Sequence, residues 1–164
     1  MKRLTLVRHA KSSWSDVTLG DRQRPLNKRG KRDAPIMGRR IMDHGIRPSL
    51  IISSPAERAW RTAKIIAAEI SYPREFLQRE DSLYLASLDD FLDVLVAQDS
   101  GFNSIMIVGH NPGITDFANF LSPGLTGNLP TAGVVSVELD QDHWNLYERP
   151  KARLLVHDYP KKSA

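Results

Sequence analysis

Short apolar runs alternate with longer amphipathic segments along most of this chain. The runs at residues 3–8, 49–54 and 104–109 have the length and composition of buried strands. Each is followed by a segment with helical character, in which apolar residues recur every three or four positions. The clearest of these apolar stripes are Ala59, Ala63, Ile66 and Ile70, then Leu88, Phe91, Leu92, Leu95 and Val96, and finally Ile114, Phe117, Ala118 and Leu121.

The end of the chain has a different pattern. Residues 133–139, 143–147 and 152–159 are predicted to be strands joined by short turns. Together with the alternation before them, they predict a three-layer α/β/α sandwich around a mostly parallel sheet, with antiparallel additions near the C-terminus. Because no internal repeat or long linker divides the sequence, residues 1–164 are expected to form a single domain.

The start of the helix within residues 27–46 has two interpretations. In one, Asn27 caps the helix, and Pro35 lies inside it and kinks it, because proline lacks the N–H of an interior turn. In the other, Asp33 is the cap and Pro35 lies in the first turn, where proline is tolerated. We favour Asp33.

Polar side chains stand where each of the three predicted parallel strands ends. Arg8 and His9 follow the first strand, Ser53 and Ser54 end the second, and His110 follows the third. Ligands of open parallel sheets bind beyond the carboxyl ends of the strands. A lone arginine or histidine at such a position is usually a surface residue, but three coinciding strand ends indicate a site.

Two of these strand ends are predicted to lead directly into helices. Ser54 and Glu57 have the spacing of a capping box with proline between them, which places Arg58 in the first helical turn. After His110, Asn111 can cap a helix that Pro112 opens. Free N–H groups at both helix starts, two arginines and two histidines would together favour a phosphoryl group. His44, His143 and His157 follow no strand end and are interpreted as residues without a catalytic role.

Composition and charge narrow the class of protein. The 164 residues are 41% hydrophobic and 26% charged, with a net charge of +4, as in a globular protein that binds anions. The basic run at 21–33 lacks interleaved aromatic residues, so nucleic-acid binding is not expected. We expect this run to be a solvated helix face instead. No apolar run approaches the roughly 18 residues of a membrane span. The absence of cysteine favours the cytoplasm, and no carboxylate or cysteine stands at ligand spacing from His9 or His110 to hold a metal.

Four stretches of the sequence resemble motifs of a known family. "LVRHAKSSW" (6–14), "RPLNKRG" (24–30), "SSPAERAWRTA" (53–63) and "VGHNPG" (108–113) resemble, in the same order, motifs of the histidine phosphatase superfamily, which includes the phosphoglycerate-mutase-like enzymes. The short length is most similar to the small SixA-like phosphohistidine phosphatases. The resemblance therefore implies a phosphoglycerate-mutase-like sandwich.

The resemblance also implies roles for the residues at the strand ends. His9 would be the nucleophile that accepts the phosphoryl group, and Arg8, Arg58 and His110 would bind its oxygens, without a metal or other cofactor. Phosphoryl transfer needs mainly positioning and charge stabilisation, which arginines supply. Arg24 would add a further phosphate contact.

Other assignments depend on the same resemblance. Ser15 stands where larger members carry a substrate-binding asparagine, and Asn111 is a second candidate for substrate binding. Members that act on phosphate esters use a carboxylic acid after the second motif; here Glu80 is the candidate and Asp81 the next. Both could instead be solvated loop residues. Ala10 replaces the family's glycine after the nucleophile.

The sequence thus predicts a metal-independent phosphatase that works through a phosphohistidine on His9 and acts on phosphohistidine in proteins. A phosphatase of small phosphomonoesters is the alternative enzyme. A phosphate- or phosphoprotein-binding module without turnover is the alternative of another class, although Arg8, Arg58 and His110 beside His9 argue against it. The oligomeric state, the physiological substrate and any regulatory partner stay open.

Overall fold

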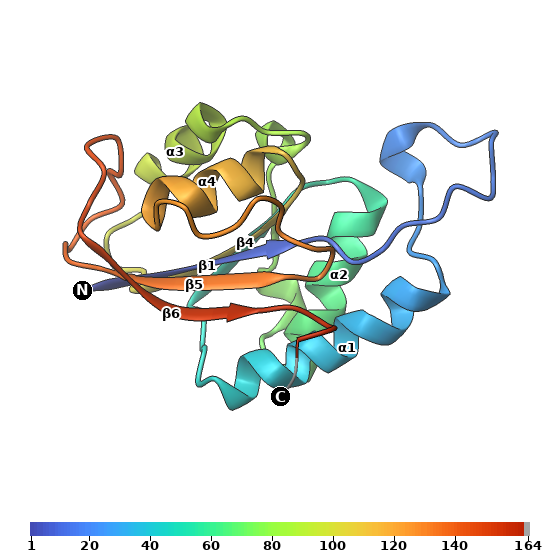
Figure 1. Ribbon diagram of the computed structural model, residues 1–164, viewed down its shortest axis with the longest axis horizontal. Helices are drawn as coiled ribbons and strands as arrows, with labels where there is room; N and C mark the ends of the chain where they lie inside the picture. The colour runs from blue at the N-terminus through green and yellow to red at the C-terminus, as the bar shows by residue number, and fades with distance from the viewer. Residues whose placement is uncertain (163–164) are drawn as a thin grey trace.

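A six-stranded sheet between two pairs of helices forms the framework of the protein in a computed structural model, which describes residues 1–162 (Figure 1). Short 3-10 helices at Asp21–Gln23, Arg74–Phe76 and Asp81–Leu83 lie in the connections. No helix within the described residues is long and apolar enough to cross a membrane. The strands and helices are β1 (Lys2–Arg8), α1 (Lys28–Asp43), β2 (Leu50–Ser53), α2 (Glu57–Glu69), β3 (Gln78–Arg79), α3 (Leu88–Val96), β4 (Ser104–Gly109), α4 (Gly113–Leu121), β5 (Val134–Leu139) and β6 (Ala152–Asp158).

The strand order is β3-β2-β4-β1-β5-β6. Strands β3, β2, β4 and β1 run parallel, β5 is antiparallel to β1, and β6 is antiparallel to β5. The predicted mostly parallel sheet with antiparallel additions is confirmed. Since Arg8 pairs with Gly109 and Ser53 with Val108, the carboxyl ends of β1, β2 and β4 lie side by side at one edge of the sheet.

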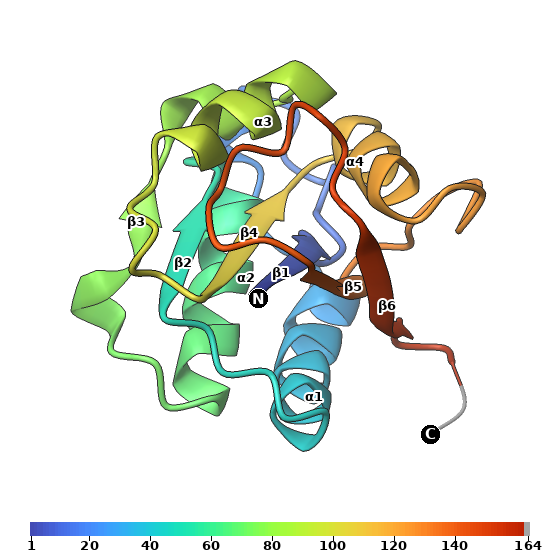
Figure 2. The same cartoon turned by 90° about the vertical axis from the view of Figure 1, so that its left-hand side faces the viewer.

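Each face of the sheet carries its own apolar core. Alternate residues of the strands point to opposite faces, so Ile105 and Ile107 pack on the side of α3 and α4, whereas Met106 and Val108 pack on the side of α1 and α2. Figure 2 shows α3 and α4 on one side of the strands and α1 on the other. The predicted three-layer sandwich is therefore confirmed. In the structure Ser87 caps α3.

Helix α1 begins earlier in the sequence than the favoured interpretation, with Asp33 as the cap, predicts. Asn27 is its N-cap, and the Asn27 side chain accepts a hydrogen bond from the Gly30 N–H at 2.8 Å, while Pro35 lies inside the helix. Asp33 is a buried helical residue rather than a cap. The helix N-terminus is docked on the loop after β1: Asn27 N–H donates to the Lys11 carbonyl at 3.0 Å, and a Cβ on Gly30 would lie 2.1 Å from that oxygen. This tertiary contact fixes the start that sequence rules placed later.

Both helices at the strand ends begin later than predicted. Helix α2 starts at Glu57, and its N-cap residue, Ala56, provides no side-chain cap. The Ser54 hydroxyl lies 2.7 Å from His110 Nε2 and also accepts from the Ala56 N–H at 3.3 Å. Helix α4 starts at Gly113, and the Asn111 side chain does not cap it. The prediction that Ser54 and Asn111 are N-cap residues is therefore wrong: Ala56 and Pro112 hold these positions, and the side chains of Ser54 and Asn111 bind residues of other segments.

The predicted strand at 143–147 is absent; these residues form an irregular connection between β5 and β6. Trp144 and Leu146 are fully buried against the core on the α3–α4 face, and the Trp144 indole N–H donates to the Phe102 carbonyl at 2.8 Å. Their apolar alternation reflects burial of a loop and not strand pairing. The short edge strand β3 was not predicted, because two exposed residues give no periodic signal.

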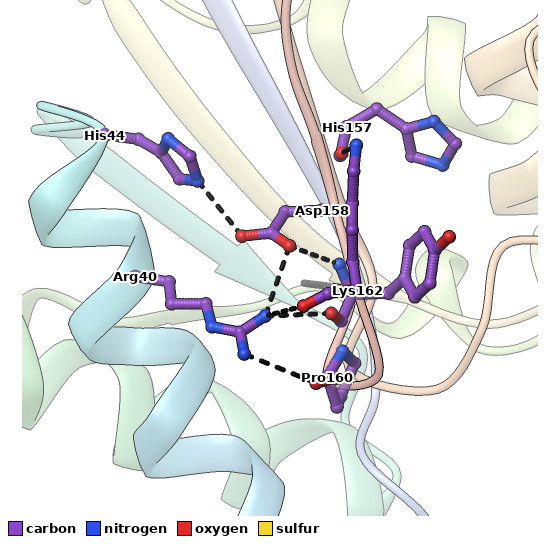
Figure 3. Close-up of polar contacts among 7 residues, drawn as sticks. Arg40, His44, His157, Asp158, Pro160 and Lys162 are labelled. Atoms are coloured by element: carbon purple, nitrogen blue, oxygen red, sulfur yellow. Dashed lines mark hydrogen bonds and ion pairs between the residues drawn. The ribbon is translucent and has the colours of Figure 1, made fainter. Parts of the chain in front are cut away.

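The segment after β6 is fastened to α1. The Arg40 guanidinium donates to Asp158 Oδ1 at 3.2 Å and to the Tyr159 carbonyl at 2.9 Å, and His44 Nε2 lies 3.0 Å from Asp158 Oδ2. Figure 3 shows Arg40 and His44 directed towards Asp158. His157 lies beside this cluster. His44 therefore belongs to a surface cluster of side chains that links the end of α1 to the end of β6.

Candidate active site

A pocket of about 150 Å³ lies at the ends of β1 and β4, beside the first turn of α2. A larger hollow of about 440 Å³ lies near the start of β2, between Pro48 and Gln78, and contains none of the predicted site residues. The small pocket is the candidate site because it gathers residues from the ends of β1 and β4, from the first turn of α2 and from the loop after β1. Among its lining residues are Arg8, His9, Arg24, Arg58, His110 and Asn111.

His9 is held in one ring orientation directly after β1. Its Nδ1 lies 2.7 Å from the Ala10 carbonyl oxygen. A carbonyl can only accept, so Nδ1 carries the proton and Nε2 keeps its lone pair in the neutral ring. The side chain is buried, and this burial lowers the pKa of His9 to about 3, with the positive charges of Arg58 and Arg8 acting in the same direction. His9 is therefore neutral at pH 7, as a nucleophile must be.

His110 faces His9 from the end of β4. The two ring centroids are 5.1 Å apart, and His110 Nε2 lies 2.7 Å from Ser54 Oγ. The buried Nδ1 has no hydrogen-bond partner within residues 1–162. Burial lowers the pKa of His110 to about 4, and the neighbouring Arg58 adds to this effect. Ser54 thus fixes one ring nitrogen and leaves the other for a ligand.

Two arginines flank the histidines, Arg58, which is buried, and Arg8, which is half-buried. The Arg8 Nη1 donates to the Leu129 carbonyl at 3.0 Å. The Arg58 Nη1 donates to the Asp21 carbonyl at 2.6 Å, and its Nη2 donates to Asp21 Oδ2 at 2.9 Å. In both guanidinium groups the Nε is buried without a hydrogen-bond partner among the described residues. Buried N–H groups that are left over in this way suit a ligand that supplies acceptor oxygens.

Arg24 forms one wall of the pocket from the loop after β1. Its guanidinium carbon lies 3.3 Å from the centroid of the exposed Trp14 ring, and its Nη2 donates to Ser12 Oγ at 2.9 Å. The Nη1 is buried and makes no hydrogen bond within residues 1–162. The stacking holds a further cationic group at the pocket in a fixed plane.

Asn111 lines the pocket, but its amide binds protein groups. Its Nδ2 donates to Asn128 Oδ1 at 2.5 Å and to the Leu129 carbonyl at 3.2 Å, while its Oδ1 accepts from Thr115 Oγ1 at 2.6 Å. These contacts tie the loop before β5 to the start of α4. Asn111 therefore shapes the wall beside Arg8.

The structure does not bring Glu80, Asp81 or Ser15 to the pocket. The Glu80 carboxylate turns back onto the 3-10 helix that follows it, accepting from Ser82 Oγ at 2.9 Å, and borders a separate hollow beside α3. Asp81 is exposed. The Ser15 hydroxyl lies 2.8 Å from that of Ser13 in the exposed part of the loop after β1.

Two residues that sequence reasoning missed complete the surroundings of Arg58. Asp21 contacts Arg58 and also Arg24, whose Nε is 3.3 Å from Asp21 Oδ1. The Tyr84 hydroxyl donates to Asp21 Oδ2, and its ring meets the His110 ring edge-on at 5.6 Å between centroids. Asp21 belongs to the basic run at 21–33, which the sequence predicts to be a solvated face, and Tyr84 lies in a loop that contains no motif. No sequence pattern therefore marks either residue as part of the site.

Comparisons with known proteins show which family this chain is similar to. A family model for the histidine phosphatase superfamily (branch 1) matches residues 4–81. An uncharacterised chloroplast protein of Arabidopsis thaliana is 32% identical over 151 residues, covering 87% of this chain and 69% of that protein. The structure of a candidate phosphohistidine phosphatase, SixA from Agrobacterium tumefaciens, is 27% identical with a TM-score of 0.83, covering 97% of this chain and 98% of that one.

A second SixA structure, that of a protein histidine phosphatase complexed with tungstate, shares the fold. Its TM-score is 0.80 at 20% identity, and the match covers 96% of this chain and 97% of that one. The chain belongs to the histidine phosphatase superfamily. Within this class of phosphatases it is SixA-like and has the expected phosphoglycerate-mutase-like fold.

Proposed function

We propose that this protein is a phosphatase that forms a phosphohistidine on His9 and acts on phosphohistidine in proteins. The observation that carries the proposal is the state of His9: a neutral ring with its Nδ1 proton held by the Ala10 carbonyl, beside Arg8, Arg58 and His110. In this state the Nε2 lone pair is available for attack on phosphorus.

In the first step, the Nε2 lone pair of His9 bonds to phosphorus while the bond from phosphorus to the substrate's imidazole nitrogen breaks. The electron pair leaves with that nitrogen, which takes up a proton from water. In the second step, a water molecule attacks the phosphohistidine, its proton goes to solvent, and the bond to Nε2 breaks to release inorganic phosphate and neutral His9.

The cationic residues would stabilise the charge on the three transferred oxygens. Arg8 and Arg58 line the pocket, and the buried Nε–H of each has no hydrogen-bond partner within residues 1–162. If the Ser54 hydroxyl donates to His110 Nε2, then His110 Nδ1 carries a proton and becomes a third donor. We assign this tautomer to His110 because it leaves a donor, rather than a lone pair, for the phosphoryl oxygens.

The shape of the pocket supports a protein substrate. Its volume of about 150 Å³ is below the roughly 300 Å³ at which small-molecule pockets begin. Trp14 and Leu85, which are 71% and 56% exposed, stand on its rim as apolar contacts for a surface that presents a phosphoryl group. The side chains that line the pocket are cationic, polar or apolar, and no carboxylic acid is among those that the structure places there. An imidazole leaving group suits such a pocket, because its conjugate acid has a pKa of about 6.5 and its departure needs little acid catalysis.

The proposal treats residues 1–164 as one domain that acts in the cytoplasm, since a chain without cysteine requires no oxidising compartment. It also proposes that no metal takes part, because cationic side chains supply the charge. The test compares hydrolysis of a histidine-phosphorylated protein, an alkyl phosphate and p-nitrophenyl phosphate, each with and without EDTA.

The expected result is EDTA-insensitive hydrolysis with the highest kcat/KM for the phosphohistidine protein. His9→Ala should abolish it, whereas His143→Ala, at an exposed histidine between β5 and β6, should leave it unchanged. A higher kcat/KM for the alkyl phosphate would move the assignment to small phosphomonoesters. Binding of phosphate without any turnover would make the protein a binding module.

A further inference from the structure

Asp21 stands at the centre of a cluster that joins three separate segments over the candidate site. The Asp21 carbonyl and Oδ2 accept from Arg58 at the start of α2, and Oδ2 also accepts from the Tyr84 hydroxyl, which follows the third 3-10 helix. The other carboxylate oxygen, Oδ1, is 3.3 Å from Arg24 Nε. Asp21 is not among the residues that line the pocket. Its contacts are with the residues that do.

The orientation of the Arg58 guanidinium depends on Asp21. Within residues 1–162 both of its hydrogen bonds go to Asp21, one to the backbone oxygen and one to the carboxylate. Its side chain is only 4% exposed, so water cannot replace these partners freely. Of the five N–H donors of a guanidinium, Asp21 engages two, and the buried Nε–H is left without a protein partner.

We infer that Asp21, held by Tyr84, is the positioning residue for Arg58: it grips one side of the guanidinium so that the remaining donors meet the phosphoryl oxygens. This inference rests on the proposed function for its kinetic consequences, but not for the binding of phosphate. Donors fixed before the reaction stabilise the transition state without reorganisation. A rotated Arg58 would still attract an anion through its charge but would align poorly with it.

Asp21 acts in this account as an anion and not as a proton donor. The hydrogen bond from Tyr84, together with the bond from Arg58 and the charges of Arg58 and Arg24, holds the pKa of the Asp21 carboxyl below its usual range. An ionised carboxylate has no proton to give to a leaving group. It also offsets part of the positive charge that would otherwise attract phosphate.

The two functions of Asp21 predict opposite effects on kcat and on anion binding. In Asp21→Asn the carboxylate charge is lost, so inorganic phosphate should bind about threefold more tightly. The misaligned Arg58 should lower kcat by about 10-fold to 100-fold. A residue needed only for folding would weaken both together. Tyr84→Phe should shift both quantities in the same directions by smaller factors, and it serves as the second variant if Asp21→Asn does not fold.

The experiment measures kcat for p-nitrophenyl phosphate and for an alkyl phosphate, and phosphate binding by isothermal titration calorimetry, in the full chain. Asp16→Asn is the matched control, because Asp16 lies in the same loop and its carboxylate binds only Thr18 among the described residues. The expected result is an equal fall in kcat on both substrates with tighter phosphate binding. A kcat equal to that of the control, a fall that grows with the pKa of the leaving group, or weaker phosphate binding would each overturn the inference. A wild-type protein without turnover would refute the proposed function, and calorimetry alone would then decide whether Asp21 restrains anion binding.

Discussion

The buried, neutral histidines should make the protein lose stability as the pH falls from 7 to 5. Burial lowers the pKa of His9 to about 3 and that of His110 to about 4, whereas both would titrate near 6.5 in the unfolded chain. At pH 5 the unfolded state therefore binds protons that the folded state refuses, and acid favours unfolding. The loss begins near pH 6.5 and grows until the folded pKa is reached.

The size of the effect at pH 5 depends little on the folded pKa, because both values lie well below 5. The 1.5 units between 6.5 and 5, at about 1.36 kcal/mol per unit, correspond to about 2 kcal/mol for each histidine. Replacing His9 by glutamine removes one titrating ring and should reduce the total loss between pH 7 and pH 5 by about 2 kcal/mol.

The assay is urea unfolding followed by tryptophan fluorescence at pH 7 and pH 5. Carboxylates and the other histidines also titrate, so the informative quantity is the difference between wild type and variant. His143→Gln is the matched control, because this exposed histidine should leave the loss close to that of the wild type. An equal loss in His9→Gln and in the wild type would refute the burial of a neutral His9.

Three further predictions concern activity. Arg58→Ala should lower kcat/KM by about 10²–10³, since it removes a preorganised donor, and steady-state kinetics on p-nitrophenyl phosphate checks this. Ser54→Ala should lower kcat about tenfold, because His110 loses the hydrogen bond at 2.7 Å that orients it, and a stopped assay on the phosphohistidine protein measures the change. Glu80→Gln should change kcat less than about twofold on alkyl phosphate and phosphohistidine alike, since its carboxylate binds Ser82 away from the pocket; a selective loss on alkyl phosphate would restore Glu80 as the acid.

The part of the site that the sequence predicts lies at the strand ends. His9, Arg8 and His110 follow directly from buried runs of apolar residues, and parallel pairing brings such ends together whatever the loops do. Local pattern therefore suffices for them. The same holds for α3, whose Ser87 cap and Asp90 partner are close in sequence.

The remaining parts depend on contacts between distant segments. The Ser54 hydroxyl accepts from the nearby Ala56 N–H, which local spacing can suggest, but its bond to His110 depends on the approach of the end of β4, 56 residues along the chain. Tyr84 meets Asp21 across 63 residues, so no spacing rule connects them. The start of α1 is set by the Lys11 carbonyl against Gly30, a close approach of two backbones that leaves no trace in periodicity.

The most direct test of the account is the identity of the phosphorylated atom in the intermediate. The protein is mixed briefly with a histidine-phosphorylated protein, quenched in alkali to preserve phosphohistidine, and digested for peptide mapping, with phosphorus NMR to distinguish the two ring nitrogens. Because the Ala10 carbonyl holds the Nδ1 proton, the account predicts a phosphoryl group on Nε2 of His9. Phosphate on Nδ1, on any other residue, or on none while turnover proceeds would contradict it.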